Sequence, residues 1–185
     1  MTKLKTGEDI RNQGTGNMGA ANTLDVTGDK SLAFFVFLLD ALKGSFAVIM
    51  INQFFGVDAY KISLGVIFVV LGHNLNIFMK GKGGRGLATA FGAIIVINPL
   101  PAILWCLVWA ISSKLFKKNV HFANIISSIL SPIMLFNTPA LIIKNMTIIK
   151  LDNLFTFIVM FIMVNVLILI KHKEYFKDFI DEFKG

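Results

Sequence analysis

Five long stretches with few charged residues divide this chain. Each is long enough to cross about 30 Å of hydrocarbon, which takes about 20 residues of helix. Of the 185 residues, 55% are hydrophobic and only 16% are charged, too apolar a balance for one water-soluble core. The sequence therefore predicts an integral membrane protein; with Cys106 as the only cysteine, it excludes a disulfide-built secreted module as well as a soluble enzyme. The stretches cover residues 31–52, 60–79, 87–116, 122–143 and 151–170.

The third stretch is too long for one span, and two prolines interrupt it. We expect a short helix over about 87–97 that turns at Pro99 and Pro101 into a longer helix ending near Phe116. The fold class predicted is an all-α integral membrane protein with about six membrane helices, including this proline-broken hairpin. The other expected spans are Ser31–Asn52, Tyr60–Met79, Phe122–Ile143 and Leu151–Ile170.

We expect the whole chain, 1–185, to form a single membrane domain. In this interpretation a Gly/Asn-rich loop occupies 1–30, the helical bundle 31–170 and an interfacial tail 171–185. No apolar segment lies within the first 30 residues, so no signal peptide is expected. The tail repeats aromatic and aliphatic residues at helical spacing, which predicts an amphipathic helix on the membrane surface. These residues are Phe176, Phe179, Ile180 and Phe183.

The net charge of +7 gathers in the connections between spans. Basic residues crowd 1–30, 80–85, 114–118 and the tail, which the positive-inside rule places in the cytoplasm. We therefore expect a multi-pass membrane protein with these segments on the cytoplasmic side and 53–59 and 145–150 outside. Lipid headgroups, and not nucleic acid, are the expected partners of this charge.

The first unusual loop runs from Gly14 to Thr23. Its glycines match a G-x-G-x-x-G spacing, but no strand precedes them and a membrane span follows, so a dinucleotide fold is excluded. Gly14, Gly16 and Gly19 let the backbone fold closely around an anion. Thr15, Asn17 and Asn22 add side-chain donors. The alternative is an ordinary flexible loop.

The second unusual loop runs from Lys80 to Gly86 and leads directly into an expected helix. It is not a Walker A loop, because no Ser or Thr follows Lys82 at the required position. The glycines, including Gly83 and Gly84, the cations Lys82 and Arg85, and the helix N-terminus favour an anion site. A contact with lipid headgroups is the alternative. Two anion loops on one membrane face indicate two phosphorylated ligands.

The other polar residues leave alternatives open. Asp40 and Lys43 share one face of a span, either as a structural ion pair or as part of a substrate site. His73 is either a catalytic contact or a hydrogen-bonded structural histidine, and His121 reads as an interfacial residue. No His, Cys and carboxylate cluster has metal-ligand spacing, so we expect neither metal nor other cofactor.

Several of these residues together resemble a known family. The segment from Asp9 and Arg11 through Gly14–Asn22 is similar to the first motif of the bacterial acyl-phosphate:glycerol-3-phosphate acyltransferases, the PlsY family. Asp40-x-x-Lys43-Gly44 resembles its next landmark. Gly72-His73, followed by the run from Lys82 to Gly92, resembles its second motif. The resemblance covers about residues 9–172.

The resemblance implies transfer of a fatty acyl group from acyl phosphate to glycerol 3-phosphate, giving lysophosphatidic acid and phosphate. It implies that the first loop, with Arg11, holds the acyl phosphate. Lys82 and Arg85 would bind phosphate charge, and Lys82, His73 and His172 are the implied catalytic residues. Because acyl phosphate carries a good leaving group, electrostatic stabilisation and positioning can supply most of the catalysis.

The chain also departs from that family. The family begins with a further membrane helix, and it has Arg, Pro and Lys at the positions of Asp25, Asn76 and Arg85. In the third motif, Tyr175 and Asp178 stand in place of Asn and Arg after the matching histidine, and the later Glu is missing. An inactive or altered paralogue, or a non-enzymatic lipid-binding or transport protein, is therefore the alternative function.

Overall fold

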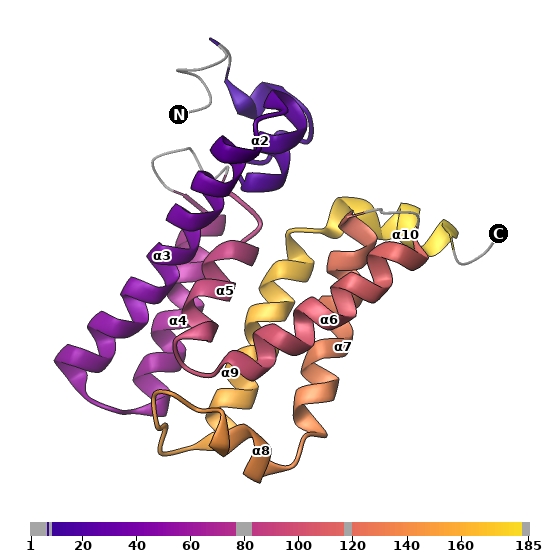
Figure 1. Ribbon diagram of the computed structural model, residues 1–185. Helices are drawn as coiled ribbons and strands as arrows, with labels where there is room; N and C mark the ends of the chain where they lie inside the picture. Colours follow the sequence, from indigo (N-terminus) through magenta and orange to yellow (C-terminus); the bar gives the residue numbers. More distant parts are fainter. Residues whose placement is uncertain (1–6, 8, 77–82, 117–119, 183–185) are drawn as a thin grey trace.

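The computed structural model describes residues 7, 9–76, 83–116 and 120–182, and every regular element in these ranges is a helix (Figure 1). The main helices are α3 (Lys30–Phe55), α4 (Ala59–Asn74), α5 (Leu87–Ile95), α6 (Pro99–Leu115), α7 (Val120–Phe136) and α9 (Leu154–Ile170). Shorter elements are η1 (Ile10–Asn12), α2 (Ala20–Thr27), α8 (Ala140–Asn145), η3 (Lys173–Tyr175) and α10 (Phe176–Glu182).

The main helices match the number and order of the predicted membrane helices. In the described ranges, α3 alone is a single helix both long and apolar enough to cross a membrane by itself. Helices α4, α6, α7 and α9 have 16 or 17 residues, and α5 has only 9. At about 1.5 Å per residue, α5 reaches only part of the way across.

The break between α5 and α6 lies where the prolines predicted it. Asn98 caps α6 by accepting a hydrogen bond from the backbone N–H of Leu100 at 2.9 Å, and Pro99 occupies the first helical turn. The Asn98 amide also donates to the carbonyl of Ile143 at 2.8 Å and to the hydroxyl of Thr147 at 2.9 Å. These bonds satisfy a fully buried side chain and fix the turn inside the protein.

Close packing against α3 supports the short helix α5. A methyl group added at Gly44 would lie 2.0 Å from the carbonyl oxygen of Thr89, and one at Gly92 would lie 1.9 Å from that of Ala41. The Ser45 hydroxyl donates to the carbonyl of Gly92 at 2.7 Å. Glycine is therefore required at both positions, because only its bare Cα allows the two backbones to approach this closely.

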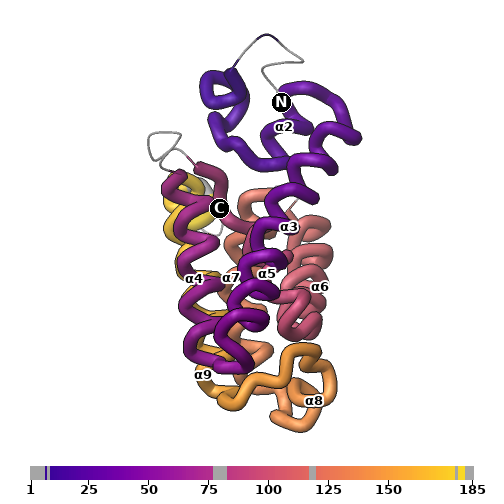
Figure 2. Tube along the Cα trace, turned by 90° about the vertical axis from the view of Figure 1, so that its left-hand side faces the viewer, coloured from indigo at the N-terminus to yellow at the C-terminus, as the bar shows by residue number. Residues whose placement is uncertain are grey.

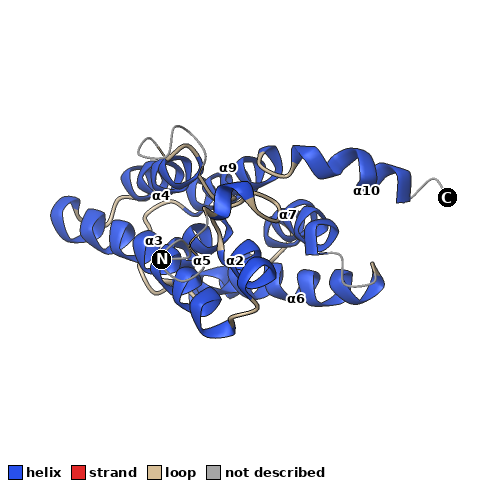
Figure 3. Ribbon diagram, turned by 90° about the horizontal axis from the view of Figure 1, so that it is seen from above, coloured by secondary structure: helices blue, strands red, loops and turns tan. Residues whose placement is uncertain are grey.

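The unusual loops and the tail lie at the same end of the bundle. Helices α2 and α10 lie at the upper end in Figure 1, and α8 lies at the opposite end, as Figure 2 also shows. Figure 3 shows α10 extending away from the bundle beside α7. Phe179 of α10 packs edge-on against Phe122 of α7, with ring centroids 5.4 Å apart, which attaches the tail to the bundle.

Several predicted boundaries were wrong. The span expected over Phe122–Ile143 is two helices, because α7 ends at Phe136 and Pro139 precedes the separate helix α8. The span expected at Tyr60–Met79 ends as α4 at Asn74, and residues 77–82 lie outside the described ranges.

The start of α9 and both ends of the chain also differ from the prediction. Helix α9 begins at Leu154 and not at 151, because Asn153 caps it. The expected loop over 1–30 contains η1 and helix α2. The tail begins with η3 before α10, and its predicted Phe183 lies beyond the described residues.

Candidate functional site

A cavity of about 490 Å³ opens at the end of the bundle that carries the two unusual loops. Asn17 and Gly19 of the first loop and Arg85 of the second line its mouth. Its body lies among α5, α6 and α9 and is almost entirely apolar, with walls that include Leu87, Ala90, Ile94, Ala102, Phe161, Val164 and Ile168. A polar mouth on an apolar body suits a molecule with an anionic head and a hydrocarbon tail.

Two helix N-termini meet at this mouth. Gly19 is the N-cap of α2, and Gly86 is the N-cap of α5 in a left-handed conformation with φ of 83°. Both residues line the cavity. Because both caps are glycines, no cap side chain in the described structure accepts a hydrogen bond from the first N–H groups of either helix. The first backbone N–H groups of both helices are therefore available to anions, and both helix dipoles favour negative charge here.

Asn22 holds the first loop together from the inside. It is only 2% exposed, and its Oδ1 accepts hydrogen bonds from the N–H of Thr15 at 2.8 Å and the Thr15 hydroxyl at 3.1 Å. Its amide nitrogen donates to the carbonyl of Asn17 at 2.8 Å. The side chains of Asn22 and Thr15, both expected to bind phosphate, are thus bonded to each other, whereas Asn17 lines the cavity.

The glycines of the first loop follow from its tight turns. Gly14 and Gly16 have positive φ angles of 56° and 66°, which side chains disfavour. A methyl group at Gly14 would also lie 2.3 Å from Oδ1 of Asn22. Arg11, also expected to bind phosphate, instead donates from Nε to both carboxylate oxygens of Asp9 at 2.9 Å, and it does not line the cavity.

The second loop lies directly on His73, at the end of α4. A methyl group at Gly83 would lie 1.9 Å from the carbonyl oxygen of His73, and one at Gly84 would lie 2.1 Å from its Nε2. Glycine is required here because the loop backbone touches the histidine. Lys82, predicted as both a catalytic and a binding residue, lies outside the described residues.

His73 and Asp40 form a polar pair in the cavity wall. His73 Nδ1 lies 3.4 Å from Oδ1 of Asp40, and the same oxygen accepts from Nζ of Lys43 at 3.1 Å. The sequence left Asp40 open between an ion pair and a site residue; its carboxylate makes the ion pair and also lines the cavity. No group of three His, Cys, Asp or Glu residues within the described ranges is placed to hold a metal ion.

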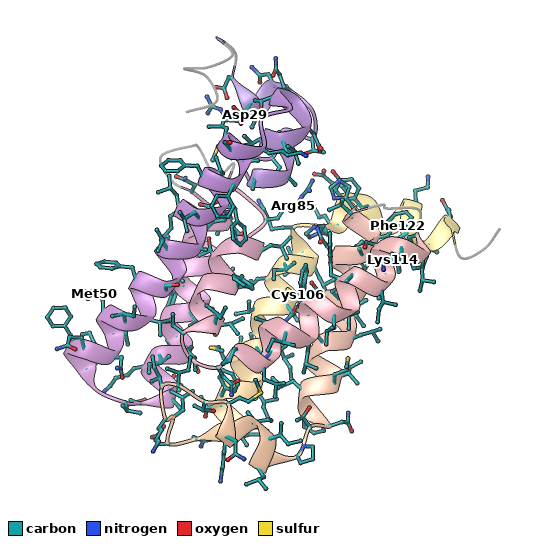
Figure 4. All side chains as sticks on the ribbon, in the orientation of Figure 1. Asp29, Met50, Arg85, Cys106, Lys114 and Phe122 are labelled. Atoms are coloured by element: carbon teal, nitrogen blue, oxygen red, sulfur yellow. The ribbon has the colours of Figure 1, made fainter. Side chains whose placement is uncertain are left out.

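Arg85, labelled in Figure 4, is held by residues from two other segments. Its Nη2 donates to the hydroxyl of Tyr175 at 2.7 Å, and its Nη1 lies 3.1 Å from Nδ1 of His121. Because a guanidinium only donates, His121 Nδ1 is the acceptor. The rings of His121 and Tyr175 stack with centroids 3.8 Å apart. His121 was expected to be merely interfacial; it contacts the cation that lines the cavity mouth.

His172 lies beside the cavity without lining it. The side chain is fully buried, its Nδ1 donates to the carbonyl of Ile168 at 2.8 Å, and its Nε2 lies 3.3 Å from the amide nitrogen of Asn124. Burial is the main cause that lowers its pKa to about 4, with the charge of Arg85 adding to the effect. His172 is therefore neutral at physiological pH, with Nε2 as the acceptor.

Asn124 is a cavity residue that the sequence did not single out. Its Oδ1 accepts from the indole N–H of Trp109 at 3.0 Å, and its amide nitrogen donates to His172. These two bonds fix the orientation of an amide that lines the cavity between α7 and α9. Asn124 belongs to no recognised motif, and its partners are distant in the sequence.

Comparison with known proteins identifies relatives over most of the chain. A family model described as glycerol-3-phosphate acyltransferase matches residues 1–182. Curated proteins named glycerol-3-phosphate acyltransferase from Aquifex aeolicus and Rhodopseudomonas palustris are each 38% identical to this chain. The matches cover 74% and 76% of this chain, and 69% and 71% of the respective relatives.

Solved structures agree with these relatives. The crystal structure of PlsY, an integral membrane glycerol 3-phosphate acyltransferase, in its glycerol 3-phosphate form matches with a TM-score of 0.78 and 32% identity. That match covers 98% of this chain and 82% of the other. The lysophosphatidic acid form matches with a TM-score of 0.76 and 27% identity, covering 98% and 85%. The predicted all-α membrane fold is confirmed.

Proposed function

This chain belongs to the glycerol-3-phosphate acyltransferase family, and we propose that it acylates glycerol 3-phosphate with acyl phosphate as the donor. The products are lysophosphatidic acid and inorganic phosphate. The observation that carries the proposal is the cavity, which joins two anion-binding helix N-termini to an apolar body. The alternative functions considered from the sequence, a non-enzymatic carrier and an inactive paralogue, receive no support from the relatives.

The reaction balances without a cofactor. A hydroxyl oxygen of glycerol 3-phosphate attacks the acyl carbonyl carbon, a new ester C–O bond forms, and the C–O bond to phosphate breaks. The bonding electron pair leaves with the phosphate. We assign the hydroxyl proton to Nε2 of His73, whose other nitrogen lies 3.4 Å from Asp40. That carboxylate orients the ring and stabilises the imidazolium that forms.

The residues at the cavity mouth mainly stabilise the negative charge of the phosphate groups. The N-terminus of α2 and the first loop hold the acyl phosphate, with Asn17 and Gly19 facing it. Arg85 and the N-terminus of α5 neutralise phosphate charge from the second loop, with Lys82 beside them in sequence. Negative charge that develops on the leaving phosphate meets donors that are already oriented, so little reorganisation is needed.

His172 acts in this proposal as a positioning residue. Its two ring nitrogens bind Ile168 and Asn124, and Asn124 reaches the cavity. This arrangement gives His172 a way to affect the site without touching substrate. Nε2 of His172 could accept a proton only after its hydrogen bond from Asn124 breaks.

We further propose that 1–185 forms one membrane domain in the bacterial inner membrane, with both loops on the cytoplasmic side. The support is the distribution of charge: Lys and Arg concentrate at the end of the bundle that carries the cavity mouth. Glycerol 3-phosphate is a charged, water-soluble molecule, so it reaches the mouth from the cytosol. The acyl donor reaches the apolar body from the membrane.

The test is an assay of the purified protein in detergent micelles with palmitoyl phosphate and labelled glycerol 3-phosphate. We expect lysophosphatidic acid and inorganic phosphate in equal amounts, and no product when palmitoyl-CoA replaces palmitoyl phosphate. The His73→Gln variant should lose most of the activity while retaining the helical circular dichroism of the native protein. Phosphate release without lysophosphatidic acid would contradict the proposal, because it would mean hydrolysis and not acyl transfer.

A further inference from the structure

A second cavity, of about 390 Å³, lies at the end of the bundle that carries α8, opposite to the mouth of the first cavity (Figure 1). It opens between the break that separates α5 from α6 and the segment that joins α8 to α9. An apolar wall from Leu151, Leu154 and Phe157 faces three charged side chains, those of Lys144, Lys150 and Asp152. The proposed acyl transfer uses none of these residues.

Hydrogen bonds between segments fix the walls of this cavity. The backbone N–H of Ile148 donates to the carbonyl of Ile97 at 2.9 Å, which attaches the segment after α8 to the α5–α6 break. The buried amide of Asn98 donates to the carbonyl of Ile143 and to the hydroxyl of Thr147, and so holds α8 against the same break. The cavity is therefore formed by the fold itself and does not need a ligand to shape it.

The two lysines of this cavity are exposed and unpaired. Within the ranges that the structure describes, the ammonium groups of Lys144 and Lys150 form no ion pair and no hydrogen bond. Lys61, near the start of α4, differs from them because its Nζ lies 3.3 Å from Oδ2 of Asp58. Two unpaired cations that face one cavity attract an anion.

The single carboxylate of the cavity leaves an excess of positive charge. Oδ1 of Asp152 accepts a hydrogen bond from the backbone N–H of Ala59 at 2.8 Å, at the N-terminus of α4, where the helix dipole favours a negative charge. Two further helices begin at the cavity, since its lining includes Asn98, the N-cap of α6, and Leu154, the first residue of α9. The positive ends of these dipoles add to the charge of the lysines.

We propose that this cavity binds the phosphate of a membrane phospholipid. Lys144 and Lys150 donate to the phosphate oxygens, and the glycerol and the first methylene groups of the lipid lie on the wall formed by Leu151, Leu154 and Phe157. The apolar wall favours a lipid over dissolved phosphate, because only a lipid has apolar groups to place there. The ends of membrane helices also lie at the level of the lipid headgroups.

The first experiment measures how fast each lysine of the native protein is acetylated by sulfosuccinimidyl acetate in dodecyl maltoside, with mass spectrometry of its peptides as the readout. The protein is compared with and without dioctanoyl phosphatidylglycerol. We expect this lipid to slow the acetylation of Lys144 and Lys150 severalfold, because the phosphate covers both ammonium groups. Lys61 should react at the same rate in both samples, since it does not line the cavity.

Two further samples separate the chemistry of the ligand from its source. Dioctanoylglycerol has the same tails without the phosphate, and inorganic phosphate has the charge without the tails. We expect neither to protect the two lysines at the concentration at which the phospholipid does. Protection by dioctanoylglycerol would overturn the role of the lysines, and protection by inorganic phosphate would show a site for dissolved anions and overturn the lipid assignment.

Variants test whether the two lysines act on one ligand. In Lys144→Gln, the phospholipid concentration that half-protects Lys150 should rise about tenfold, because one charge-assisted hydrogen bond to the phosphate is lost. In Lys61→Gln this concentration should not change, although the same charge is removed from the same end of the bundle. An equal rise in both variants would mean that only the overall charge of this end attracts the lipid.

The remaining outcomes also decide the proposal. Equal protection of Lys61, Lys144 and Lys150 in the native protein would show that the lipid merely coats this end, and no protection at any lysine would remove the site. All readouts are made on the lysines and require no acyl transfer. Failure of this proposal and failure of the proposed function are therefore separate results.

Discussion

Arg85 donates a hydrogen bond of 2.7 Å to the hydroxyl of Tyr175, although 90 residues separate them in the sequence. The guanidinium carbon also lies 4.9 Å from the centre of the Tyr175 ring. Both residues depart from the pattern of the family that the sequence resembles, and the structure brings the two departures into contact. A lysine has no planar group to stack on the ring, so arginine and tyrosine suit each other here.

The first prediction concerns this contact. Tyr175→Phe removes the hydroxyl but keeps the ring, so Arg85 loses one acceptor and its orientation toward the cavity. We expect the KM for the phosphate substrate that Arg85 binds to rise about tenfold, with little change in kcat. Steady-state kinetics with each substrate varied in turn measure both constants. Tyr60→Phe, at the exposed far end of α4, is the matched control.

A double-mutant cycle tests whether Tyr175 acts through Arg85. Arg85→Gln alone should raise the same KM, and adding Tyr175→Phe to it should have little further effect, because the coupled partner is already gone. Fully additive effects would mean that Tyr175 acts on the substrate by another route.

The second prediction concerns the contact between the second loop and His73. In Gly84→Ala the new methyl group would lie 2.1 Å from Nε2 of His73, so the loop or the ring must move. We expect a loss of activity of at least about a hundredfold, because displacing a catalytic group by 1 Å has effects of that size. Gly72→Ala is the control, since a methyl group there meets nothing within 4 Å. Native activity in Gly84→Ala would show that His73 tolerates displacement.

The sequence predicted the helices well because apolar length and proline placement are local signals. Pro99 and Pro101 predicted the break between α5 and α6. The charge distribution predicted that the two glycine loops lie at the same end of the bundle. The ends of spans were less predictable. Asn137, Thr138 and Pro139 separate α7 from α8, but they lie inside an otherwise apolar stretch, and Pro132 lies inside α7 without ending it.

Only those parts of the site that consist of neighbouring residues in the sequence could be predicted. The glycines at 14, 16, 83 and 84 could be recognised in the sequence, and the structure gives each a steric reason. By contrast, His121 and Asn124 gain their roles from partners 36 and 48 residues away. His172 matched a motif, but the sequence could not show that its two nitrogens are both bonded inside the protein.

The third prediction concerns sidedness. Asp25 lies on α2, at the end with the cavity mouth, and Lys150 follows α8, which lies at the opposite end (Figure 1). Both side chains are exposed. In a Cys106→Ser background, Asp25→Cys should react with an impermeant maleimide only when the cytoplasmic side is accessible, and Lys150→Cys should react from outside. Labelling of Asp25→Cys in intact spheroplasts would contradict the proposed orientation, because it would place this end of the bundle outside the cell.

The fourth prediction uses the native cysteine. Cys106 is exposed and lines the body of the cavity, beyond Arg85 as seen from the mouth (Figure 4). Lysophosphatidic acid should slow its reaction with a small maleimide severalfold, because the acyl chain covers it. Ile111→Cys in the Cys106→Ser protein lies on the same helix, exposed but outside the cavity, and should show no protection. Equal protection at both positions would indicate detergent-like coating of the protein.

The last prediction concerns pH. The unfolded chain protonates His172 near its ordinary pKa of 6.5, whereas the folded protein resists protonation until about pH 4, mainly because the ring is buried. Below pH 6.5 the unfolded state therefore binds more protons than the folded state, and stability falls as the pH is lowered toward 4. The integrated loss is on the order of 3 kcal/mol, and the full contribution is present above pH 6.5.

Melting temperatures in detergent between pH 4.5 and 7.5 measure this effect. Carboxylates titrate in the same range, so the informative quantity is the difference between the native protein and His172→Gln. The glutamine variant should be less stable than the native protein at pH 7.5, because it keeps the hydrogen-bonding capacity but loses the fit of the ring. That gap should narrow as the pH falls, since only the native protein has a histidine here to protonate. A gap that stays constant from pH 7.5 to 4.5 would mean that His172 is protonated as easily in the bundle as in water, and it would contradict the lowered pKa of the buried ring.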